Sequence, residues 1–239
     1  MKTKKIKIAV IAVLLVVAVS IGAFAYLTRP VVAPSTDIES ATPSLPGAAI
    51  QGGAVITIYR ISQNASKAEF AVDEILRSSP NTAVGTTNQV AGDIQINMTD
   101  PSKSTVGTIR VNARTFKTDS SQRDGAIGRF ILKSEDAANE FIDFEPTALN
   151  GMPAKITEGT PFNFEITGDL TIAGVTKPTT FHGEATVGSE GQLSVTATTT
   201  VKRSDYNLPI PNVPFVASVE DNVFLTISIT ANAIPSGIN

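Results

Sequence analysis

The sequence predicts an all-β domain with one antiparallel sheet system, preceded by an apolar N-terminal segment and a linker. Between residues 55 and 233, short stretches that alternate apolar and polar residues recur with turn residues between them. This is the pattern of half-buried strands and their connections. The composition agrees, because 17% of the residues are charged, 42% are hydrophobic, and Thr and Ser supply much of the remaining polarity.

Residues 1–29 have the pattern of a membrane anchor. Lysines at positions 2, 4, 5 and 7 precede an uncharged run over residues 8–27, which is about the length that crosses a bilayer as a helix. The lysines are expected in the cytoplasm, which makes the chain a single-pass protein of the cell membrane with its domain on the extracytoplasmic side. The alternative is a signal peptide cleaved near Ala25, after "AFA", which would leave a secreted or periplasmic protein. The run is longer than most signal-peptide cores, which favours the retained anchor.

Residues 30–53 are interpreted as a Pro/Ala/Ser-rich linker. The segment "PVVAPSTDIESATPSLPGAAIQGG" has almost no large apolar side chain, so its burial is not expected to offset the entropy lost on ordering it. The linker would space the β domain, residues 54–239, away from the membrane.

The β domain is expected to hold eight or nine strands and one short helical segment. Strands are predicted at residues 55–60, 67–72, 89–97, 105–113, 141–149, 161–172, 179–187, 192–201 and 222–233. A helix is predicted over residues 123–140, although Gly125 and Gly128 weaken its first half. The mostly short connections favour a closed barrel or a sandwich.

The longest predicted strand favours the barrel. On residues 162–172 the apolar side chains share one face and the polar side chains share the other. A long strand with one apolar face suits an up-and-down barrel that closes on its own inner surface. This strand and residues 179–187 form a hairpin by pattern, with Gly174 and Pro178 on either side of the turn.

Several classes of function are disfavoured by composition. The net charge of −3 leaves no basic face for phosphates, so no nucleic-acid partner is expected. The chain has no cysteine, which excludes disulfides, thiolate metal sites and a cysteine nucleophile. The single histidine, His182, is interpreted as a surface residue, and the acidic residues between 135 and 145 as a solvated face. Neither an enzyme, a metal site nor a cofactor is predicted.

The segment "GDLTIAGVTKPTTF", residues 168–181, resembles the central signature of the YceI-like family of lipocalin-like, exported polyisoprenoid-binding proteins. Similar segments follow the order found in that family. They are "YRISQNASKAEFAV", "AVGTTNQVAGDIQI", "TIRVNARTFKTDSSQRD", "FIDFEPTAL" and "RSDYNLPIPNVPFVASVEDNVFLTISITANA". The resemblance covers about residues 59–233. It implies an eight-stranded antiparallel lipocalin-like barrel that holds a long isoprenoid or a similar amphiphile in its lumen.

The sequence departs from the family pattern at two places. Ala65 and Ser66 stand where many members have His-Ser, which puts a polar contact there in doubt. Glycines in "GAIGRFIL" stand where members commonly have helix formers, so the helix is expected to be looser or shorter than usual.

The candidate ligand-binding residues are the apolar side chains assigned to the lumen. They are Phe70, Val72, Ile109, Val111, Phe130, Phe141, Phe162, Phe164, Ile166, Leu170, Ile172 and Phe215. An eight-stranded barrel is either packed solid or holds one small ligand. Small residues on stretches such as "TIRVNA" and "VTATTTV" favour the hollow interior.

Arg123 and Asp124 are candidates for a polar gate at the barrel mouth, where they would bind a ligand head group. The alternative is an exposed ion pair or a helix cap. The stiff segment "NLPIPNVPF", residues 207–215, is expected to cross the mouth. The sequence thus predicts an exported, membrane-tethered protein that binds an isoprenoid or quinone-like lipid. A solid barrel that binds another protein through its loops is the alternative, and a hydrolase that uses His182 ranks third.

Overall fold

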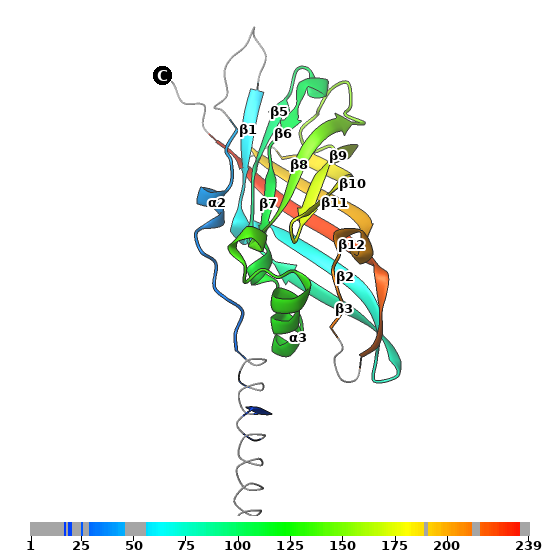
Figure 1. The fold of residues 1–239 in the computed structure, drawn as a ribbon. Coiled ribbons are helices and arrows are strands. Elements are labelled where there is room, and N and C mark those ends of the chain that lie inside the picture. The colour runs from blue at the N-terminus through cyan, green and yellow to red at the C-terminus, as the bar shows by residue number, and fades with distance from the viewer. Residues whose placement is uncertain are drawn as a thin grey trace, which may run out of the picture.

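Within the described residues, twelve strands form one antiparallel sheet that curls strongly around an apolar interior (Figure 1). The computed structural model describes residues 29–45, 56–188, 191–211 and 216–234, together with residues 17, 19, 20 and 25. The strands are β1 (Ile56–Ile61), β2 (Lys67–Leu76), β3 (Ser79–Thr87), β4 (Val90–Ala91), β5 (Asp93–Asn97), β6 (Thr105–Val106), β7 (Ile109–Asn112), β8 (Phe141–Asn150), β9 (Phe162–Ile172), β10 (Val175–Val187), β11 (Gln192–Lys202) and β12 (Val216–Ala233). Their order is β4-β7-β8-β9-β10-β11-β12-β1-β5-β6, and β2 pairs with both β12 and β3.

The end strands of this order, β4 and β6, are each followed in the chain by the strand that lies next to the opposite end. End strand β4 is joined to β5 through Gly92, and end strand β6 is joined to β7 through residues 107–108. Gly92 has a φ of 155°, and a Cβ at this position would lie 2.7 Å from Cδ1 of Ile109. Glycine therefore lets the chain change its pairing partner here, from β7 before Gly92 to β1 after it. The sheet bends back on itself as a result.

The expected count of eight strands is wrong, although the all-β antiparallel class is confirmed. Two predicted strands are each divided into two, namely residues 89–97 into β4 and β5, and residues 105–113 into β6 and β7. Strand β3 was not expected, because "SPNTAVGTT" begins with turn-forming residues and lacks large apolar side chains. Residues 79–87 form a strand because they pair with β2, and not because of their own residue pattern.

The hairpin of β9 and β10 is confirmed, but its turn is shorter than expected. Ala173 and Gly174 have φ values of 48° and 77°, as in the two-residue turns that match the twist of paired strands. Pro178 lies inside β10, opposite Asp169. Strand β10 pairs with β11 only from His182 onward. Pro178 is tolerated because the side on which it lacks an N–H has no neighbouring strand to bond at this position.

The predicted helix over residues 123–140 ends early. The chain forms α3 (Ser121–Ala126), continues as the π-helix η4 (Ile127–Ile131), and later makes the 3-10 turn η5 (Ala137–Asn139). The side chain of Ser120 accepts a hydrogen bond from the N–H of Arg123 and so caps α3. Helix η4 packs closely on its surroundings, since a Cβ on Gly128 would lie 3.1 Å from Cγ1 of Val31.

Residues 29–45, here called the strap, lie against the outside of the sheet and include the short helix α2 (Ile38–Ala41) (Figure 1). Ile38 is fully buried, and α2 packs on β4 and β7. The interpretation of residues 30–53 as a free spacer is therefore wrong for residues 30–45, while residues 46–53 lie outside the described residues. The sequence argument failed because the strap is held largely by hydrogen bonds to its backbone, which composition does not reveal.

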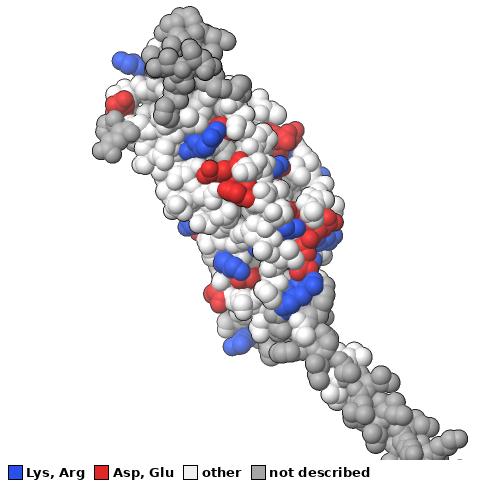
Figure 2. Space-filling model, turned by 90° about the vertical axis from the view of Figure 1, so that its left-hand side faces the viewer, with Lys and Arg blue, Asp and Glu red and all other residues white. Residues whose placement is uncertain are grey.

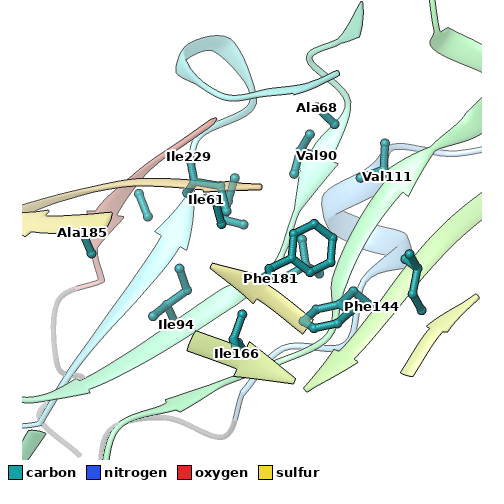
Figure 3. Packing of buried hydrophobic residues seen from close by; sticks show 14 of the residues in the cluster. Ile61, Ala68, Val90, Ile94, Val111, Phe144, Ile166, Phe181, Ala185 and Ile229 are labelled. Atoms are coloured by element: carbon teal, nitrogen blue, oxygen red, sulfur yellow. The ribbon is translucent and has the colours of Figure 1, made fainter. Parts of the chain in front are cut away.

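The buried apolar side chains lie on the inner side of the curled sheet (Figure 3). Phe144 of β8 and Phe181 of β10 meet in an edge-to-face contact with ring centroids 5.1 Å apart. Branched side chains from other strands, including Ile61, Ile166 and Ile229, point into the same space.

In the described part of the chain, no helix has the length and apolar character needed to cross a membrane. The proposed anchor, residues 8–27, falls mostly outside the described residues. The anchor therefore stays a prediction.

Candidate functional site

A single cavity of about 680 Å³ stands out inside the curled sheet among the described residues. Its walls come from β2, β3, β5 to β12, and from the α3–η4 helix. The lining is mostly apolar, and its charged members are few. The volume and the apolar lining fall in the range of small-molecule sites in proteins.

Most of the residues assigned to the lumen from the sequence do line this cavity. They are Phe70, Val72, Ile109, Val111, Phe162, Phe164, Ile166, Leu170 and Ile172. Strand β9 contributes its whole apolar face, as the alternation of its residues predicted. Whether these side chains touch a ligand stays a prediction.

Two of the assigned residues, Phe141 and Phe130, do not line the cavity. The ring of Phe141 packs against the guanidinium of Arg110, 4.6 Å away, and does not line the cavity. Ile142 and Phe144 line it instead, so the alternation along β8 places Phe141 on the opposite face. Phe130 is half-buried on η4, where the neighbouring Ile127 and Ile131 face the cavity. Phe215 lies outside the described residues.

Phe116, Phe144 and Phe181 line the cavity but were not among the assigned residues. The sequence held a signal for Phe181, because it alternates with the polar residues of β10 and so shares a face with Ala185. In the structure it lies directly opposite Ile166 of β9. No periodic pattern marked Phe116, which follows the 3-10 turn η3 (Ala113–Thr115). Its ring packs on Phe70 at 5.3 Å, a contact that tertiary structure creates.

Two glycines give the largest side chains room along the cavity wall. Phe70 and Gly85 face each other across β2 and β3, and a Cβ on Gly85 would lie 2.3 Å from the Phe70 ring. Phe164 and Gly183 form the same arrangement across β9 and β10, with 2.5 Å from the would-be Cβ to the ring. Because each ring occupies the space above a glycine, it takes up less of the interior.

The mouth of the cavity is marked by lining residues that are exposed to solvent, Arg77, Asp119 and Gln122. They come from the turn between β2 and β3 and from the start of α3. Ile210 and Pro211 line the same end, so part of the segment 207–215 lies at the mouth as expected, while residues 212–215 are outside the described residues.

Of the predicted polar gate, Arg123 lies at the mouth and Asp124 does not. Arg123 donates to the carboxylate of Glu74 at 3.0 Å and to that of Asp119. Asp124 is buried, is not part of the cavity lining, and accepts hydrogen bonds from the N–H and hydroxyl of Thr118 at 2.7 and 2.8 Å. It therefore stabilises the turn before α3 and is neither an exposed ion pair nor the cap of this helix, which is Ser120.

Among the described residues the cavity lining is mostly apolar, whereas the outside is mixed in charge. The face in Figure 2 has Lys and Arg interspersed with Asp and Glu, without a large patch of one sign. The His182 side chain is 70% exposed, with Nδ1 3.5 Å from the carboxylate of Glu165. It does not line the cavity. Among the described residues, no group of His, Asp and Glu is placed to hold a metal ion.

The comparisons with known proteins agree with this architecture. The model of the YceI-like domain matches residues 59–231. A polyisoprenoid binding domain from Saccharophagus degradans, implicated in plant cell wall breakdown, superimposes with a TM-score of 0.58 at 13% identity, covering 74% of this chain and 98% of that one. Burkholderia cenocepacia BcnA superimposes with a TM-score of 0.54 at 15% identity, covering 72% of this chain and 99% of that one. At these identities the likeness is one of fold. No match was found among the curated proteins.

Proposed function

Because the chain belongs to the YceI-like family, we propose that it is a binding protein for a polyisoprenoid or quinone-like lipid, held in the cavity of the curled sheet. The observation that carries the proposal is the apolar cavity of about 680 Å³. Each CH₂ group that moves from water into such surroundings contributes about 0.8 kcal/mol, so a long hydrocarbon chain gains more than a short polar molecule. The similar fold of a polyisoprenoid binding domain supports the same ligand class.

The position of charge supports an amphiphile with its polar end at the mouth. The charged lining residues include Glu74, Arg77, Asp119 and Arg123 at this end, whereas the far interior is lined by residues such as Ile94, Ile96 and Leu193. A charged group would be costly deep inside without a partner. The hollow interior also weighs against the alternative of a solid barrel that acts through its loops.

We further propose that the protein holds its ligand without converting it and is tethered to the extracytoplasmic side of the cell membrane. Among the described residues the lining is mostly apolar, its charged members include those at the mouth, and His182 lies outside it. Support for the tether is the uncharged run of residues 8–27 after four lysines. N-terminal sequencing of the protein from membranes tests this, because a start at Tyr26 would identify a cleaved signal peptide.

Ligand binding is tested by extracting the lipid that purifies with the full chain and identifying it by mass spectrometry. Ile166→Trp adds volume on the cavity wall, whereas Glu165→Trp adds the same indole on the outer face of β9. We expect wild type and Glu165→Trp to retain an isoprenoid lipid and Ile166→Trp to lose it. In a hollow interior the stability of Ile166→Trp falls little, whereas overpacking of a solid one costs about 1–3 kcal/mol. Wild type without lipid, together with a strongly destabilised Ile166→Trp, would refute the proposal.

A further inference from the structure

The strap begins beside the helix that forms one wall of the cavity mouth. Arg29 pairs with Glu135 at 2.5 Å, and the backbone carbonyls of Arg29 and Pro30 accept hydrogen bonds from the guanidinium of Arg129. Arg129 is 8% exposed and also donates to Glu135 at 3.0 Å. The first residues of the strap are thus fixed to η4 by a charged group that is itself buried.

Further contacts keep the strap in place beyond this point. Val31 packs on Gly128 of η4. The carbonyl of Ala33 accepts from Arg114 at 3.2 Å, and Ser35 donates to the carboxylate of Glu140 through its N–H and its hydroxyl at 2.8 and 2.6 Å. These contacts repeat over successive strap residues, so the strap cannot swing at its start as a flexible linker would.

The α3–η4 helix connects the strap to the mouth. Gly128 and Arg129 face the strap, whereas Ala126, Ile127 and Ile131 line the cavity. In Figure 1, α3 lies at the lower end of the domain, where β2 and β3 meet at their turn, and the strap runs from this end toward β1. The chain therefore enters the domain at the end that holds the mouth.

The uncharged run ends at Leu27, two positions before Arg29. Two residues span at most about 7 Å when fully extended. We propose that the strap holds the domain against the bilayer with the cavity mouth facing the lipid surface, so that the ligand passes between membrane and cavity while the domain stays in place. This inference rests on the proposed anchor and lipid ligand. The partner is the bilayer itself. The half-buried apolar residues Leu76, Ile210 and Val216 at the rim suit contact with lipid better than contact with a charged partner.

Absence of cysteine from the chain allows a single label to be placed at will. Gln122→Cys puts a fluorophore at the mouth, and Thr160→Cys puts it on the exposed loop between β8 and β9, at the opposite end of the domain. The labelled full chain is reconstituted into phosphatidylcholine vesicles that contain a lipid with a nitroxide on its head group. We expect several-fold stronger quenching at position 122 than at position 160.

A second variant tests the role of the strap. Insertion of about ten Gly and Ser residues between Thr28 and Arg29 leaves the strap contacts intact but lengthens the tether by roughly 16–19 Å on average. We expect the insertion to abolish the difference in quenching between positions 122 and 160 while the bound lipid is unchanged. Equal quenching in the parent chain, or a difference that the insertion does not alter, would overturn the orientation alone. If the full chain does not float with the vesicles, residues 8–27 are not an anchor and the inference is wrong. Failure of the ligand proposal is a separate outcome, seen as wild-type protein that purifies without lipid.

Discussion

The carboxylate of Glu140 binds Ser35, which lies 105 positions earlier in the chain. Glu140 is 1% exposed and also accepts from Asn112 at 3.1 Å and pairs with Arg114 at 2.8 Å. Burial by itself would raise the pKa of Glu140, but the hydrogen bonds from Ser35 and Asn112 and the charge of Arg114 outweigh it and lower that pKa below its usual 4.5. The strap and the sheet therefore share one buried ionised group.

Glu140→Gln is expected to lower the free energy of unfolding at pH 7 by about 3 kcal/mol, because Arg114 is left buried without its counter-ion. A carboxyl whose pKa is lowered by folding contributes stability above its unfolded-state pKa, and this contribution is lost as the pH falls through the folded-state pKa. Wild type should thus lose stability below about pH 4.5 more steeply than Glu140→Gln. Denaturant unfolding at a series of pH values measures both effects, with the exposed Glu158→Gln as control. Parallel pH profiles for wild type and Glu140→Gln would contradict the assignment.

Gly183→Ala is expected to destabilise the domain and to reduce the amount of bound lipid. The new Cβ would lie 2.5 Å from the ring of Phe164 and 2.8 Å from the carbonyl oxygen of Thr196, so the ring must move toward the cavity. Such overpacking costs about 1–3 kcal/mol. Thermal unfolding and lipid content are compared with Glu184→Ala, in which the neighbouring exposed side chain is shortened. A fully stable Gly183→Ala with normal lipid content would mean that the Phe164 ring does not depend on this glycine.

Arg123 and Glu74 are expected to stabilise the mouth as a coupled pair. The Glu74 side chain is 5% exposed, and it also accepts a hydrogen bond from Asn81 at 2.8 Å. Arg123→Gln leaves this carboxylate without its charged partner, so the two single variants, Arg123→Gln and Glu74→Gln, should not be additive. In a double-mutant cycle monitored by denaturant unfolding, we expect a coupling energy of about 1–3 kcal/mol. If the two changes in unfolding free energy add, Arg123 and Glu74 stabilise the mouth independently of each other.

His182→Ala is expected to leave both stability and bound lipid unchanged. The side chain is exposed, and an exposed pair such as the one with Glu165 contributes about 0–1 kcal/mol. Its neighbour Phe181 faces the cavity, so Phe181→Ala provides a matched contrast that should cost about 3–5 kcal/mol. Lipid content and melting temperature distinguish the two variants. A loss of lipid in His182→Ala would return this residue to the candidate site.

Much of the sheet could be predicted because side chains in a strand alternate between two faces. The bounds of β9 and the residues that it directs into the cavity follow from its alternation. The same rule, applied to β8, would have excluded Phe141. Strand β3 could not be found this way, because pairing with β2 and not its own pattern makes it a strand.

The sequence by itself determined the all-β class, the apolar face of β9 and the absence of thiol chemistry, because each depends on local pattern or composition. Tertiary structure decided where the mouth lies, which member of the Arg123–Asp124 pair faces it, and whether the strap is free or fixed. These depend on partners far apart in the chain, as when Arg114, Arg129 and Glu140 bind the backbone and side chains of residues 29–35. Hydrogen bonds between such distant groups produce no periodic pattern in the sequence, so they can be identified only in the folded structure.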